Sequence, residues 1–136
     1  MKNTTIIIVI ILTIFFVFEA HAEQKAIRLI CKYSHTIDAA GKSSRTTGEE
    51  LITVRFSDNG NARIKKQGLG AEFIGKISDE EIYGETEYSF SGSGLTYRET
   101  LKINRYTGAF ENTFNINESK GLIHYGKCEP VTQRKF

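Results

Sequence analysis

Apolar residues recur at every second position over most of this chain, and this alternation constrains its fold more than any other feature. Ile52, Val54 and Phe56 alternate with polar residues, and Phe110 and Phe114 share one face of a later segment. A period of two is typical of a strand with one buried and one exposed face. Such segments are expected at 27–33, 52–56, 62–67, 70–77, 82–90, 95–103, 110–116 and 122–128. The sequence therefore predicts an all-β protein of about eight antiparallel strands.

Short runs of glycine and small polar residues separate these segments and predict how they are connected. The runs at 57–60, 91–94 and 105–108 have the composition of tight turns, which join neighbouring strands as hairpins. The segment 38–48 is the longest predicted loop. Eight strands connected in this way form either an up-and-down barrel or a barrel-like sandwich.

The N-terminus has the order of composition of an export signal. A short positive start, Met1-Lys2-Asn3, precedes an apolar run at 6–18, and Ala20-His21-Ala22 has the small-x-small pattern of a cleavage site. The run is shorter than the roughly 20 residues that a spanning helix needs, so no stable membrane insertion is expected after cleavage. The prediction is a signal peptide at 1–22 and a single β-domain at 23–136, periplasmic or secreted. An uncleaved anchor is the alternative.

Two cysteines, Cys31 and Cys128, bracket most of the predicted domain, and in an exported chain they indicate one disulfide. Free thiols or an intermolecular bridge are the alternative. If the two cysteines face each other on antiparallel first and last strands, Tyr33 lies opposite Gly126 and His35 lies opposite His124. The same register places Ile37 opposite Leu122. This pairing favours closure of the sheet into a barrel.

The predicted His35 and His124 pair is the sharpest candidate site. Opposed residues on paired strands have Cβ atoms roughly 5 Å apart, so the two imidazoles could share a metal ion or form a pH-sensitive pair. A metal site usually needs a third or fourth ligand, and the sequence names none. We therefore expect two solvated or hydrogen-bonded histidines and no cofactor.

Charge and motif content narrow the function classes. Loss of residues 1–22 removes one cation and one anion, Lys2 and Glu19, so the formal net charge stays at +2. No basic run is present, which argues against a nucleic-acid partner. No G-x-S-x-G elbow or complete phosphate-binding loop occurs. The interpretation is a protein that is not an enzyme, with Phe56, Phe90, Phe110 and Phe114 filling the barrel interior.

Two segments resemble known families. The pattern I-x-R-x-T-G at 103–108, with G-x-C-x-P at 126–130 and a final Lys135-Phe136, resembles small exported proteobacterial proteins without an assigned function. Separately, S-G-S-G-L-T-Y at 91–97 is similar to a loop of the periplasmic inhibitors of C-type lysozyme. That resemblance implies a disulfide-tied β-barrel whose Ser93 and Tyr97, around Gly94, enter the lysozyme cleft.

The sequence therefore favours an exported, non-enzymatic binding module of unknown ligand, whose partner is a small molecule or another protein. One alternative is a protein inhibitor of C-type lysozyme that uses the 91–97 turn. A further alternative is a metal-binding protein or enzyme built on the histidine pair.

Overall fold

The computed structural model describes residues 24–68 and 70–131, which form nine strands and no helix. The predicted signal peptide, residues 1–22, lies outside the described residues. Within the described ranges, no helix could cross a membrane. The strands are β1 (Lys25–Ile37), β2 (Ser43–Arg45), β3 (Glu49–Phe56), β4 (Asn61–Lys66), β5 (Glu72–Ile77), β6 (Glu81–Ser89), β7 (Thr96–Asn104), β8 (Ala109–Ile116) and β9 (Ser119–Pro130).

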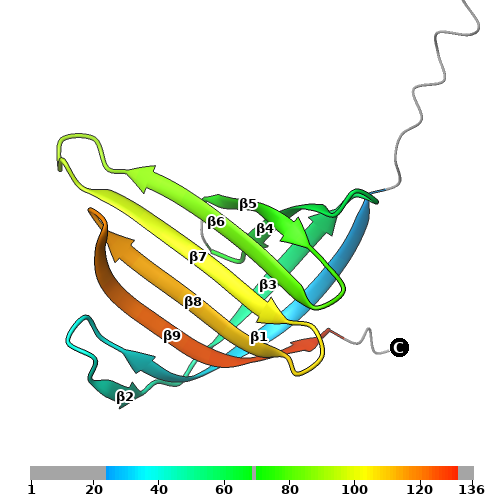
Figure 1. The fold of residues 1–136 in the computed structure, drawn as a ribbon, viewed down its shortest axis with the longest axis horizontal. Coiled ribbons are helices and arrows are strands. Elements are labelled where there is room, and N and C mark those ends of the chain that lie inside the picture. Colours follow the sequence, from blue (N-terminus) through cyan, green and yellow to red (C-terminus); the bar gives the residue numbers. More distant parts are fainter. Residues whose placement is uncertain (1–23, 69, 132–136) are drawn as a thin grey trace, which may run out of the picture.

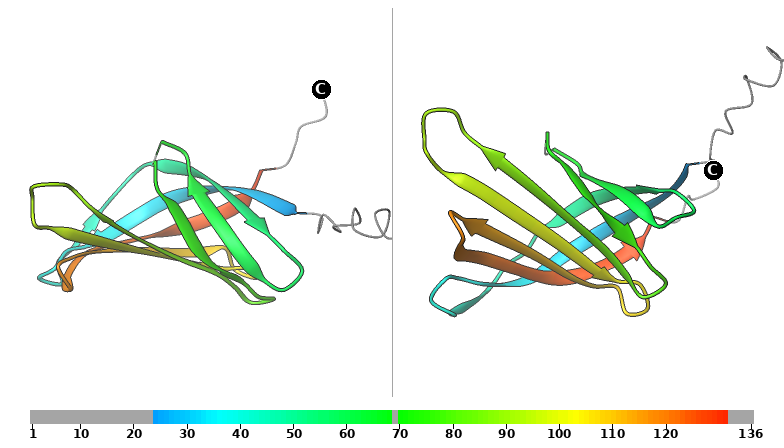
Figure 2. Two further views of the ribbon diagram at one scale, coloured as in Figure 1. Left: turned by 90° about the horizontal axis from the view of Figure 1, so that it is seen from above. Right: turned by 45° about the horizontal axis from the view of Figure 1, so that its top comes forward.

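The strands form one antiparallel sheet that closes on itself. From β3 to β9, each strand pairs with the next one along the chain, and β1 pairs with both β3 and β9 (Figure 1). Figure 2 shows the same sheet curving around its interior. The predicted all-β fold of about eight strands is confirmed, in its barrel form. The predicted loop 38–48 differs in one respect, because Ser43–Arg45 folds back on the end of β1 as the extra strand β2.

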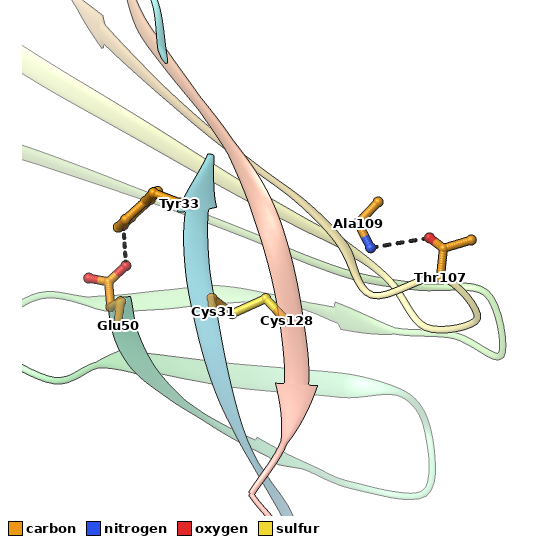
Figure 3. Close-up of a disulfide and its surroundings, with 6 residues drawn as sticks. All are labelled: Cys31, Tyr33, Glu50, Thr107, Ala109 and Cys128. Atoms are coloured by element: carbon orange, nitrogen blue, oxygen red, sulfur yellow. Dashed lines mark hydrogen bonds between the residues drawn. A yellow bond between two sulfur atoms is a disulfide. The ribbon is translucent and has the colours of Figure 1, made fainter. Parts of the chain in front are cut away.

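The disulfide joins β1 to β9, where the sheet closes. Cys31 and Cys128 are directly opposite, with their Cα atoms 3.9 Å apart (Figure 3). Tyr33 faces Gly126, as the sequence predicted. A Cβ atom at Gly126 would lie only 2.1 Å from the Lys32 carbonyl oxygen. Glycine is therefore required where β9 passes the Lys32 carbonyl of β1.

Beyond Tyr33 the predicted register is wrong, because β1 has a bulge at Ser34. His35 faces Tyr125 and Ile37 faces Ile123, so neither the His35–His124 pair nor the Ile37–Leu122 pair forms. The Ser34 hydroxyl donates to the Tyr125 carbonyl at 3.1 Å, and the Ser34 carbonyl accepts from the amide of Thr46 at 3.2 Å. One extra residue on β1 reverses the face of every following side chain relative to β9.

Apolar side chains fill the interior at the end of the barrel near the 57–60 turn. Each fully buried aliphatic or aromatic side chain there contributes roughly 1.5–3 kcal/mol to folding. The core residues are Leu29, Cys31, Ile52, Val54, Ala62, Ile64, Phe73, Ile82, Leu101, Ile103, Phe110 and Cys128. This end of the barrel is a packed core.

The four phenylalanines predicted to fill the interior have different environments. Phe110 is buried, and Phe56 is partly buried against the core. Phe114 is partly buried near the opposite end. The prediction is wrong for Phe90, which is 58% exposed because it follows the last residue of β6.

Candidate functional site

A buried group of charged side chains lies between the apolar core and the other end of the barrel. The ammonium of Lys66, at the end of β4, lies 2.5 Å from Glu99 Oε1 on β7 and 3.4 Å from Glu50 Oε1 on β3. The Lys66 and Glu99 side chains are 5% and 4% exposed, and that of Glu50 is 13% exposed. Alternation along each strand turns all three side chains inward.

Two further residues extend this group. The Tyr33 hydroxyl donates to Glu50 Oε2 at 2.6 Å (Figure 3), and Asn112 Nδ2 donates to Glu99 Oε1 at 2.8 Å. Together, Tyr33, Glu50, Lys66, Glu99 and Asn112 form what we call the interior polar network. Its members come from five strands and cross the barrel.

One acceptor in the interior polar network has no partner among the described residues. Asn112 is 3% exposed, and its Oδ1 atom receives no hydrogen bond from the described residues. The amide orientation is well defined, because Nδ2 is bonded to a carboxylate that can only accept when ionised. A buried acceptor without a donor costs about 1–3 kcal/mol. Asn112 Oδ1 therefore favours a donor from outside the described chain.

Burial also controls the protonation of Tyr33. Desolvation, followed by the hydrogen bond to Glu50, raises the pKa of the Tyr33 hydroxyl well above its usual value. Tyr33 therefore keeps its proton at neutral pH and acts as a donor. The network accordingly contains two carboxylates, one ammonium and a neutral phenol.

His124 lies beside the network on the inner face of β9. Its Nδ1 atom is 2.8 Å from Thr36 Oγ1, and its ring makes an edge contact with Tyr33 at a centroid distance of 5.3 Å. Burial, followed by the charge of Lys66, lowers the pKa of His124. The imidazole is therefore held in its neutral form.

This pKa shift predicts how stability depends on pH. Because the pKa of His124 is lower in the folded than in the unfolded state, the neutral ring stabilises the fold above about pH 6.5. That contribution is lost as the pH falls through the folded pKa. In His124→Asn, urea unfolding should show a smaller loss of stability between pH 7 and pH 5 than in the wild type. His35→Asn is the matched control, and an equal change in both variants would contradict the prediction.

Four aromatic rings from the β6–β8 side line the end of the barrel next to the network. Tyr88 and Tyr97 are opposed on β6 and β7 and stack at 5.5 Å between ring centroids. Phe90 packs edge-on to Tyr97 at 5.3 Å, and Phe114 lies 5.6 Å from Tyr97. We call these four residues the aromatic mouth. It offers apolar contact surface above a charged interior.

The residues of the 91–97 turn that were predicted to act together have different environments in the structure. Ser93 and Gly94 are exposed at the tip of the β6–β7 hairpin, at the upper left of Figure 1. The Ser93 hydroxyl donates to the Phe90 carbonyl at 2.8 Å and accepts from the Leu95 amide at 3.2 Å. Tyr97 instead belongs to the aromatic mouth. The hydroxyl of Ser93 is thus used within the turn.

The two candidate metal ligands lie on opposite faces of the sheet. His35 stacks on Tyr125 at 4.9 Å between ring centroids, whereas His124 faces the barrel interior. Among residues 24–68 and 70–131, no three histidine, cysteine or acidic side chains come together in a group that could hold a metal ion. The bulge at Ser34 therefore removes the geometry on which the metal alternative depended.

The sequence interpretation missed the interior polar network, although a signal for it was present. Glu99 shares its face of β7 with Tyr97 and Leu101, and Asn112 lies between Phe110 and Phe114 on the inner face of β8. Polar residues at inward positions of an alternating strand indicate a buried polar group. Only the tertiary structure showed that these residues contact one another.

The outer surface also has a hollow, which lacks buried polar groups. A cavity of about 640 Å³ lies around the exposed ion pair of Glu87 and Arg98. In this pair, Arg98 Nη2 is 2.9 Å from Glu87 Oε2. Its lining residues are Glu87, Thr96, Arg98, Asn115, Asn117 and Glu118. None of these side chains is buried, so the interior polar network and the aromatic mouth form the stronger candidate site.

Comparison of the chain with protein-family models, curated proteins and solved structures finds no match.

Proposed function

We propose that this chain is an exported, non-enzymatic binding module that takes a small ligand at the aromatic mouth, next to the interior polar network. The observation that carries this proposal is the unpaired Oδ1 of Asn112, buried among charged side chains beneath the mouth. The disulfide supports an oxidising compartment outside the cytoplasm.

The composition of the network supports a role in binding rather than in stability. Buried ion pairs lose much of their attraction to desolvation, and apolar residues of similar volume often give an equally stable or more stable core. The other half of this barrel is filled in that apolar way. The charged residues Glu50, Lys66 and Glu99 therefore stabilise the fold no better than apolar residues of similar volume would. Recognition of a polar group of the ligand explains why they are present.

The aromatic mouth supports an apolar part in the ligand. Phe90 is 58% exposed and still contacts Tyr88 and Tyr97, so its ring remains available to a ligand. Sites for small molecules typically combine aromatic surface with a few fixed polar groups. The mouth and the network together have this composition.

Binding of N-phenyl-1-naphthylamine, whose fluorescence increases in apolar surroundings, tests the proposal. We expect a saturable increase with the purified protein, and about 2- to 10-fold weaker binding in Phe90→Ser, since aromatic contacts of this kind contribute about 0.5–1.5 kcal/mol. Tyr106→Ser is the matched control, because Tyr106 is 75% exposed in the β7–β8 turn at the opposite end of the barrel. No saturable signal, or equal weakening in both variants, would refute binding at the mouth.

A further inference from the structure

We infer that the ligand carries a primary ammonium group on an apolar body, with the ammonium placed among Glu50, Glu99 and Asn112. This inference rests on the proposed function and assigns its ligand class.

The first support is the charge of the interior polar network. Glu50 and Glu99 bring two carboxylates into the barrel, and Lys66 brings one ammonium. Among the described residues, no second cationic side chain forms an ion pair with either carboxylate. One negative charge is left in excess at a site shielded from water, where an unbalanced charge is costly. A cationic ligand would balance it.

The second support is independent of charge. Asn112 Oδ1 is a buried acceptor to which no described residue donates, while Asn112 Nδ2 is already bonded to Glu99. A primary ammonium has three N–H donors and no acceptor. It can therefore donate to Asn112 Oδ1 and to a carboxylate at the same time. A neutral hydroxyl could supply the donor but would leave the charge excess in place.

The third support is the position of the aromatic mouth. Tyr97 lies two residues before Glu99 on the same face of β7, and Phe114 is the cross-strand partner of Glu99. Two residues of a strand span about 7 Å. An ammonium beside Glu99 would thus be joined by a short alkyl spacer to an apolar group among the rings. Aromatic faces also attract a cation directly.

The geometry favours an organic cation over a bare metal ion. The ammonium of Lys66 lies 2.5 Å from Glu99 Oε1, and it would repel a divalent metal ion on the same oxygen about twice as strongly as a monovalent organic ammonium. The ammonium of an organic ligand can also donate to Asn112 Oδ1, while the apolar part of the ligand contacts the aromatic rings.

Isothermal titration with three matched probes tests the inference at pH 7.5. The probes are 3-phenylpropylamine, 3-phenyl-1-propanol and 3-phenylpropanoate, which share an apolar body and differ in head-group charge. We expect the amine to bind at least 10-fold more tightly than the alcohol, and the carboxylate to bind more weakly than either. Calcium chloride, titrated in the same way, should give no saturable heat.

Charge-neutralising variants locate the ammonium. Glu99→Gln should reduce the preference for the amine over the alcohol at least 5-fold, and Glu50→Gln provides the same test if Glu99→Gln does not fold. Glu87→Gln, in an exposed pair on the outer face, is the matched control and should keep the full preference.

The outcomes separate this inference from the proposed function. If N-phenyl-1-naphthylamine binds at the mouth but the alcohol binds as tightly as the amine, the ammonium inference is wrong and the binding function stands. Saturable calcium binding that excludes the amine would also overturn the ammonium inference. If neither the naphthylamine nor any of the three matched probes binds, both are wrong.

Discussion

Replacing both Cys31 and Cys128 with alanine is expected to lower the free energy of unfolding by about 4–5 kcal/mol. The bond spans 97 positions of the chain, and a cross-link over a loop of about this length removes that much conformational free energy from the unfolded state in the chain-entropy model. Small domains have only about 5–15 kcal/mol of stability in total. Loss of the bond would therefore remove a large part of the stability of the barrel.

Urea unfolding of the oxidised wild type and the double variant measures this effect. Addition of dithiothreitol should bring the wild type to the stability of the variant and leave the variant unchanged. Val54→Ala, a truncation in the same core, is a control that keeps the disulfide. Its stability relative to the wild type under the same conditions should be lower by the same amount with and without reductant. A double variant within about 1 kcal/mol of the oxidised wild type would show that the pairing of β1 with β9 alone holds the barrel closed.

Lys66→Met is expected to destabilise the protein by about 3–5 kcal/mol, because it leaves two buried carboxylates without a cation. The methionine side chain keeps most of the apolar stem of Lys66, whose ammonium lies 5.7 Å from the centre of the Phe73 ring. The loss of stability should therefore result mainly from the missing positive charge and only slightly from changed packing. Urea unfolding at pH 7 measures it.

Two control variants distinguish a network from an ordinary ion pair. The triple variant Lys66→Met, Glu50→Gln, Glu99→Gln removes all three charges together and should be more stable than Lys66→Met alone. Arg63→Met breaks the exposed pair with Glu72 and should cost less than about 1 kcal/mol. A triple variant less stable than Lys66→Met would mean that the carboxylates do not depend on the buried cation.

The alternation of apolar residues was sufficient to predict the strands and their inner faces. Period-two patterns around Val54, Leu101 and Phe110 placed these residues inward, where the structure buries them. This works because a strand turns successive side chains to opposite faces, and the inner face of the packed half of the barrel is apolar. Cys31 and Cys128 then determined the register locally, including Gly126 opposite Tyr33.

By itself, the sequence thus determined the fold class, the disulfide and the local register of barrel closure, because these follow from short-range periodicity and from two unique residues. Only the tertiary structure decided which polar side chains meet. The bulge at Ser34 depends on contacts with the 46–48 segment, and it turns His35 to the face opposite to that of His124. Lys66 and Glu99 lie 33 positions apart and meet only when the barrel closes around them. Contacts of this kind depend on strand tilt and closure, which no local pattern contains.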